Sequence, residues 1–186
     1  MHLTRIARSR SAQVHKNSSS AFRMDADPDF EMVEVEVLDA HTLARSATTL
    51  SVKLRSFIVG VEIVLKVLSQ RPLALRGSEA IRCLRHTKHV LGTLAAVLKE
   101  TSSTCLRTSP PLSASLSLQE CEAHFEGITS ALCTVGVSAK LIKQGALPYK
   151  TRWILASRIA SRAEAVREYI GGLETAVMRL HHIVTA

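Results

Sequence analysis

The sequence predicts an all-α protein, an antiparallel four-helix bundle with room for a fifth short helix and with a disordered N-terminal tail. Hydrophobic residues make up 46% of the 186 residues and aromatic residues only 4%, which favours helices packed through aliphatic side chains. Two stretches, 47–68 and 159–180, carry apolar residues at alternating steps of four and three, which keeps them on one helical face. The length favours one domain, which we place at 39–186.

Residues 1–38 divide into two segments of opposite charge. Residues 1–24 hold five basic and no acidic side chains, and residues 25–40 hold seven acidic and no basic ones. We expect a largely disordered tail in a cytoplasmic protein. The Arg- and Ser-rich start also has the composition of a mitochondrial transit peptide, so that interpretation stays open. Valines alternate with glutamates over 33–37, but a lone strand has no partner, and we expect an acidic lead-in to the first helix.

The first helix should begin near Asp39 or Thr42 and end before Pro72. Its predicted buried residues are Ala47, Leu50, Leu54, Phe57, Val61, Val64 and Leu68. Its predicted solvent-facing residues are Ser51, Lys53, Arg55, Glu62 and Lys66.

The second helix should open at Ser78, which has a side chain that suits an N-cap. Its predicted buried residues are Ile81, Leu84, Leu91, Leu94, Ala95 and Leu98. Residues 101–115 are rich in Ser and Thr and contain Pro110 and Pro111, so we expect a flexible loop there.

The third helix should start at Ser115 or Ser117. Its predicted inward residues are Leu118, Cys121, Phe125, Ile128 and Leu132. Gly136, Gly145 and Pro148 are expected to bound the connection to the last helix.

The last helix should begin near Tyr149 and run past Val184. Its predicted seam is Ile159, Ala163, Val166, Ile170, Leu173, Val177 and Leu180. A single helix over 159–184 would be about 40 Å long and would need a partner of similar reach, for which we expect 47–68. We expect the two seams to be buried against each other and against the two middle helices, in a bundle with left-handed packing.

The seam of the last helix passes through Gly171 and Gly172, which cost a helix roughly 1 kcal/mol each relative to Ala. They indicate either a close approach by another helix or a kink. They argue against the alternative, an intermolecular coiled coil.

The sequence contains no nucleotide-binding, serine-hydrolase or zinc-protease motif. We therefore predict no catalytic residues, no cofactor, no small-molecule substrate and no enzymatic activity.

The four cysteines form no C-x-x-C pair, and we interpret them as reduced, mostly buried thiols of an intracellular protein. A zinc site is the alternative, because C-x-x-H occurs twice, at Cys83–His86 with His89 following and at Cys121–His124. Nearby basic residues would repel a cation, so we predict no metal site.

The candidate interaction residues form a basic patch on the second helix and just before it: Arg76, Arg82, Arg85 and Lys88. Such a patch could meet a protein partner or an anionic membrane surface. Nucleic acid is disfavoured, since no reading helix or interleaved aromatic residues accompany the patch. Charged residues interrupt every long apolar run, so no membrane span is predicted.

The order of the helices resembles the helical N-terminal domain of fungal STAND proteins, the NLR-like signalling ATPases, including HeLo-like and azaphilone-cluster-type domains. The resembling stretches are "LARSATTLSVKLRSFIVGVEIV", "VLGTLAAVLKE", "SLQECEAHFEGITSAL" and "KTRWILASRIASRAEAVREYIGGLETAVMRL", with Trp153 before the last long helix. The resemblance covers about Val33 to Val184.

This resemblance implies a non-enzymatic signalling module that binds a protein partner or self-associates. The chain departs from the pattern in the charged tail before the first helix and in the paired glycines of the last one. The NTP-binding module that often follows is absent, which indicates a stand-alone domain or a fragment. The alternative function is a peripheral membrane-binding or membrane-perturbing bundle that acts through its basic face.

Overall fold

The computed structural model describes residues 39–70, 75–107, 111–144 and 147–186, and within these ranges the chain forms six α-helices and no strand. The helices are α1 (Ala40–Ser69), α2 (Leu75–Cys105), α3 (Leu112–Ala131), α4 (Cys133–Gln144), α5 (Tyr149–Ser161) and α6 (Ala163–Thr185). The all-α prediction is confirmed. The predicted tail, 1–38, lies outside the described residues.

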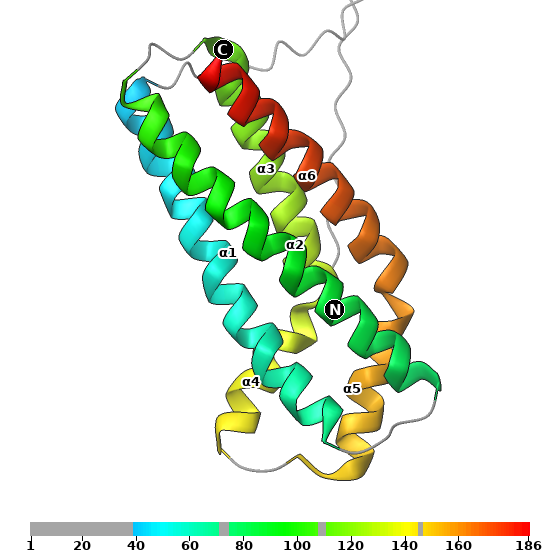
Figure 1. The fold of residues 1–186 in the computed structure, drawn as a ribbon. Coiled ribbons are helices and arrows are strands. Elements are labelled where there is room, and N and C mark those ends of the chain that lie inside the picture. The colour runs from blue at the N-terminus through cyan, green and yellow to red at the C-terminus, as the bar shows by residue number, and fades with distance from the viewer. Residues whose placement is uncertain (1–38, 71–74, 108–110, 145–146) are drawn as a thin grey trace, which may run out of the picture. The chain divides into compact units, whose positions relative to one another are not determined.

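The six helices form four antiparallel rods, because α4 continues the direction of α3 and α6 continues that of α5 (Figure 1). Around the bundle, α1 packs against α2, α2 against α5 and α6, α6 against α3, and α3 and α4 against α1. The four-helix bundle is therefore confirmed, with two short helices, α4 and α5, where one was expected.

Both predicted seams lie in the core. Phe57 is half-buried, and every other residue of the two seams is buried. The last helix, α6, packs against the two middle helices, α2 and α3, as expected. The choice of 47–68 as its direct partner was wrong, because α6 lies diagonally across the bundle from α1. Periodicity shows which face of a helix is buried but does not show which helix covers it.

The predicted start of α1 is confirmed. Asp39 is its N-cap, and one carboxylate oxygen accepts a hydrogen bond from the backbone N–H of Thr42 at 2.7 Å. This bond holds the pKa of Asp39 below its ordinary value. The helix ends at Ser69. Pro72, the predicted stop, lies outside the described residues.

One residue on the predicted solvent side of α1 is buried. The hydroxyl of Ser51 donates a hydrogen bond to the carbonyl oxygen of Ala95 on α2 at 2.7 Å. This bond satisfies a polar group at the α1–α2 contact, so the prediction that Ser51 faces solvent was wrong.

The second helix is longer at both ends than predicted. It begins at Leu75, so Ser78 lies inside its first turns and is not an N-cap. The helix continues to Cys105 through the Ser- and Thr-rich residues 101–104. Thr101 in this stretch is buried, and its hydroxyl group has hydrogen-bond partners. The Thr101 hydroxyl donates to the carbonyl of Val97 at 2.9 Å and lies 3.1 Å from His181 Nδ1. Because the single hydroxyl proton of Thr101 is donated to the Val97 carbonyl, the Thr101 oxygen acts as the acceptor toward His181. Nδ1 of His181 is therefore the nitrogen that carries a proton in this contact.

The loop predicted over 101–115 is correspondingly shorter. The third helix begins at Leu112, directly after Pro111. Ser115 and Ser117, the expected caps, are buried within the helix. Pro110 lies outside the described residues.

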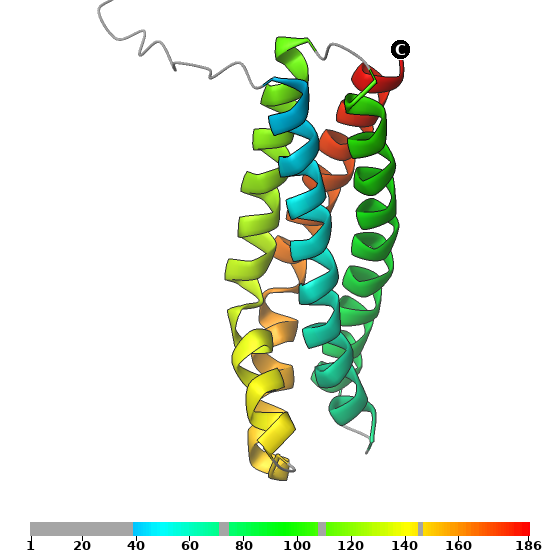
Figure 2. The same cartoon turned by 90° about the vertical axis from the view of Figure 1, so that its left-hand side faces the viewer.

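The third and fourth rods are each broken once. The α3–α4 break is at Leu132 (φ −105°), and the α5–α6 break is at Arg162 (φ −109°). Gly136 therefore lies inside α4, and the single helix expected over 159–184 is divided near its start. Gly145, another predicted boundary, lies outside the described residues. Figure 2 shows that the two breaks lie at the same level of the bundle.

The paired glycines do not interrupt α6. A Cβ atom added at Gly172 would lie 2.6 Å from Nδ1 and Nε2 of His124 on α3, whereas one added at Gly171 would meet open space. In return, a Cβ at Gly127 on α3 would lie 2.8 Å from Cγ of Tyr169 on α6. Each helix thus places a ring over a glycine of the other, and the close-approach interpretation is correct for Gly172.

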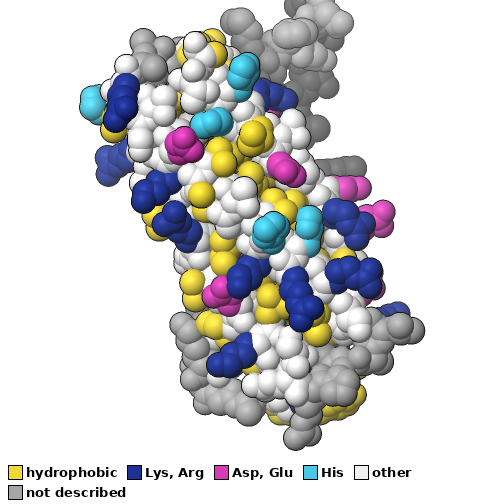
Figure 3. Space-filling model, in the orientation of Figure 1, with side chains coloured by type: hydrophobic (Ala, Val, Ile, Leu, Met, Phe, Trp, Pro, Cys, Tyr) yellow, Lys and Arg dark blue, Asp and Glu magenta, His cyan; other side chains and the backbone are white. Residues whose placement is uncertain are grey.

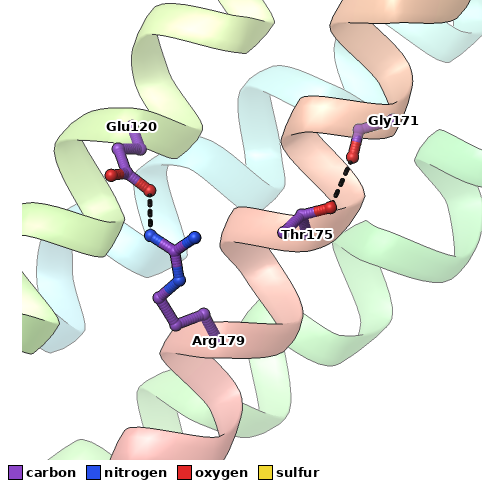
Figure 4. Close-up of polar contacts among 4 residues, drawn as sticks. All are labelled: Glu120, Gly171, Thr175 and Arg179. Atoms are coloured by element: carbon purple, nitrogen blue, oxygen red, sulfur yellow. Dashed lines mark hydrogen bonds and ion pairs between the residues drawn. The ribbon is translucent and has the colours of Figure 1, made fainter.

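Polar contacts accompany this packing (Figure 4). Arg179 of α6 forms an ion pair with Glu120 of α3, with Nη1 and Oε2 2.7 Å apart. Within α6, the Thr175 hydroxyl donates to the carbonyl of Gly171 at 2.9 Å.

Candidate interaction surfaces

The predicted basic patch lies on α2, and its two ends bind neighbouring helices. Arg76 Nη1 donates to Ser157 Oγ of α5 at 3.0 Å. Lys88 Nζ lies 2.8 Å from Glu62 Oε1 of α1, and both of these side chains are about half exposed (47% and 48%). Both ends of the patch therefore help to hold α2 in the bundle, although exposed contacts of this kind contribute little stability.

The middle of the patch is available to a partner. Arg82 and Arg85 are exposed, and neither side chain has a hydrogen bond or ion pair within the described part of the chain. Arg82 borders a cavity of about 310 Å³ between α2 and α6, together with Glu79 and Arg167. Figure 3 shows Lys, Arg and His side chains spread over this side of the bundle, with acidic side chains and hydrophobic atoms between them. The surface is mixed in charge rather than uniformly basic.

A second surface lies on another side of the bundle, where α1 meets α3 and α4. It is a groove of about 580 Å³, which we call the α1 groove. Its lining residues are Lys53, Ser56, Phe57, Val59, Gly60, Ile63, Phe125, Thr129, Val135 and Ala139. Lys53 is the one ionisable side chain in this lining, so the groove is mostly apolar.

Two aromatic rings pack beside each other in the α1 groove. The rings of Phe57 and Phe125 meet edge to face, with centroids 6.0 Å apart and planes at 88°. Phe57 remains half-buried, and Val59 nearby is 51% exposed. Val52, one heptad before Val59 on α1, is 60% exposed. These apolar side chains remain exposed in the folded bundle, and exposed apolar patches often mark binding surfaces.

The chain matches no family model, and no curated protein or solved structure matches it significantly.

No helix within the described ranges combines the length and the apolar character that crossing a bilayer requires.

Sequence reasoning missed the α1 groove. The four-three pattern on α1 assigned its buried residues and left Val52 and Val59 unexplained on the other side of the helix. Two valines seven residues apart outside the core stripe were the available signal. Nothing in the sequence indicated that residues of α3 and α4 would line the same groove, because this depends on how the helices pack together.

The structure separates the two C-x-x-H pairs. Cys83 and His86 lie on α2 facing α6, whereas His124 lies on α3 and packs over Gly172 of α6. Since α2 and α3 are not neighbours in the bundle, the premise that the two helices could share a zinc ion was wrong. Across the described residues, no three metal-ligating side chains gather at one place.

The four thiols differ in burial. Cys105 and Cys121 are buried, Cys83 is half-buried and Cys133 is exposed. Burial raises the pKa of Cys121 to about 12 and also raises that of Cys83. Raised pKa values disfavour the thiolate, which is the form that binds metals and acts as a nucleophile.

Proposed function

We propose that the chain is a non-enzymatic helical interaction module of the kind found at the N-terminus of fungal STAND proteins, and that it docks a partner protein in the α1 groove. The observation that supports this proposal is the apolar groove itself, which exposed Val59 lines, with exposed Val52 seven residues earlier on the same side of α1. Helix-in-groove docking is a common way for proteins to recognise one another.

The lining of the groove supports a proposal for the chemistry of the partner. An apolar groove between helices accepts the apolar face of another helix, with anchors at positions i, i+3, i+4 and i+7. Lys53 is the one charged group in the lining. The partner is therefore an amphipathic helix with an acidic residue beside its apolar face, which would pair with Lys53.

The test compares two substitutions at equally exposed apolar side chains. Val59 lines the groove, whereas Met178 on α6 lies outside it, and each is 51% exposed. A labelled amphipathic peptide with leucine anchors and a glutamate rim is titrated against each variant by fluorescence anisotropy. Val59→Asp should weaken binding about tenfold or more, because it places a carboxylate in the contact, and Met178→Asp should leave it unchanged.

A matched peptide with a lysine rim should bind more weakly than the glutamate peptide. Failure of wild type to bind either peptide, or equal losses for both variants, would contradict groove docking. A concentration-dependent dimer that Val59→Asp abolishes in sedimentation would instead assign the groove to self-association.

A second candidate function is binding to an anionic membrane through α2. Its supporting observation is that Arg82 and Arg85 are exposed and have no protein partner in the described residues. Flotation with phosphatidylserine vesicles should then weaken as salt rises, and the double substitution Arg82→Glu and Arg85→Glu should abolish it without lowering the melting temperature. Equal flotation of wild type and variant would exclude this face.

A further inference from the structure

An open cleft that the proposed function does not use lies beside the two breaks in the bundle. The α3–α4 break at Leu132 and the α5–α6 break at Arg162 lie at the same level (Figure 2). Between them is a cavity of about 440 Å³, within the size range of small-molecule sites. We call it the junction cleft, and its polar lining includes Ser130, Thr134, Arg158, Ser161, Arg162 and Tyr169.

The junction cleft is positively charged. Arg158 and Arg162 are four residues apart, which places them on the same side of the chain, and both line the cleft. No aspartate or glutamate is among the residues that line it. Three acidic residues, Glu126, Glu164 and Glu168, are direct sequence neighbours of lining residues, and all three are exposed and lie outside the lining.

Both guanidinium groups are available to a ligand. Neither Arg158 nor Arg162 donates a side-chain hydrogen bond or forms an ion pair within the described ranges. Arg179, by contrast, has Glu120 as its partner. Both arginines are exposed, and two like charges with no counter-charge in the lining of the cleft attract an anion.

Hydroxyl groups complete the polar lining. Ser161 donates its proton to the carbonyl of Arg158 at 2.9 Å, which leaves its oxygen as an acceptor. The hydroxyls of Ser130 and Thr134, on the opposite wall, have no partner among the described residues and can donate to an anion. The ring of Tyr169 forms a further part of the wall.

We propose that the junction cleft binds a phosphate-bearing anion. Guanidinium groups bind phosphate through paired N–H donors, and a hydroxyl adds a further donor to the same oxygens. The cleft is larger than a phosphate ion requires, so the ligand is a small organic phosphate or the phosphorylated headgroup of a lipid. The proposal concerns binding, without turnover, and it does not depend on the α1 groove.

The binding test uses titration calorimetry of the full chain with inorganic phosphate and with adenosine monophosphate, and flotation with vesicles that contain phosphatidylinositol phosphate. The variant Arg158→Ala with Arg162→Ala should lose at least about tenfold in affinity for whichever probe binds. The matched control is Arg45→Ala with Arg55→Ala, which removes two exposed charges from α1 that have no partner among the described residues and should leave affinity unchanged. Binding to vesicles alone, lost in the first variant, assigns the ligand to a lipid headgroup.

A second measurement uses wild-type protein, so it does not depend on the folding of a variant. The exposed thiol of Cys133 lines the cleft, whereas half-buried Cys83 borders the separate α2–α6 cavity. Alkylation followed by mass spectrometry should show that the bound probe slows modification of Cys133 and leaves Cys83 unchanged. Absence of saturable binding by every probe, equal losses in the two arginine pairs, or unchanged reactivity of Cys133 at saturation would overturn the proposal.

Discussion

Substituting alanine for each of the two adjacent glycines of α6 should have opposite effects on stability. Both substitutions gain about 1 kcal/mol of helix propensity, because both positions lie inside the helix. At Gly171 the new methyl meets open space, so the full gain should appear. At Gly172 it lies 2.6 Å from two ring nitrogens of His124, an overpacking that costs about 1 to 3 kcal/mol. The two variants should therefore differ by about 1 to 3 kcal/mol.

Urea denaturation of both variants measures this difference directly. His124 is half-buried and its ring is the group in the way, so a background of His124→Ala should remove the clash. In that background, Gly172→Ala should stabilise by about 1 kcal/mol, as Gly171→Ala does. Equal stabilisation by both alanines in the unaltered background would refute the ring-over-glycine packing of α3 and α6.

Three further predictions concern the core and two titrating groups. Leu173→Ala should cost about 2 to 5 kcal/mol in thermal melts, because Leu173 is fully buried; unchanged melting with loss of a dimer would move it to an interface. Asp39 has a lowered pKa, so its contribution is present above pH 3.8 and is lost as pH falls through its folded pKa; Asp39→Asn should remove that part of the acid dependence. Cys121 has its pKa raised from 9.0 to about 12, so stability should fall as pH rises through that range, and less steeply in Cys121→Ala.

The buried faces of the helices could be predicted from the sequence because they depend on local periodicity. Leu50 and Leu54 of α1 and Ile170 and Leu173 of α6 follow the four-three pattern and are buried. The neighbours of each helix could not be predicted this way. Ser51 illustrates the limit, since its burial depends on a carbonyl of α2 that the pattern of α1 does not reveal.

The two breaks were also beyond local reasoning. Neither Leu132 nor Arg162 is a glycine or proline, and the apolar pattern continues across Arg162 from Ile159 to Ala163. Each break retains a backbone hydrogen bond, from Leu132 to Ile128 and from Arg162 to Ile159, so little local cost opposes it. Gly171 and Gly172 are a stronger local signal for a break, yet α6 continues through them, and the ring of His124 on α3 occupies the space beside Gly172.

For the candidate surfaces too, the residue types could be predicted from the sequence, whereas the contacts between helices could not. The basic residues of α2 were identified from sequence, but the contacts of Arg76 with Ser157 and of Lys88 with Glu62 required the packed bundle. The α1 groove and the junction cleft form between rods, so no single stretch of sequence describes either of them.

The most direct test of groove docking is a methyl NMR titration of the full chain with the glutamate-rimmed helical peptide. We predict that the methyl signals of Val52, Val59 and Ile63 shift together and saturate, because these residues line or border the α1 groove. The methyl of Ala96, exposed on α2, should stay in place. Saturable shifts at Ala96 with none at Val59 or Ile63 would contradict the account and move the docking surface to α2.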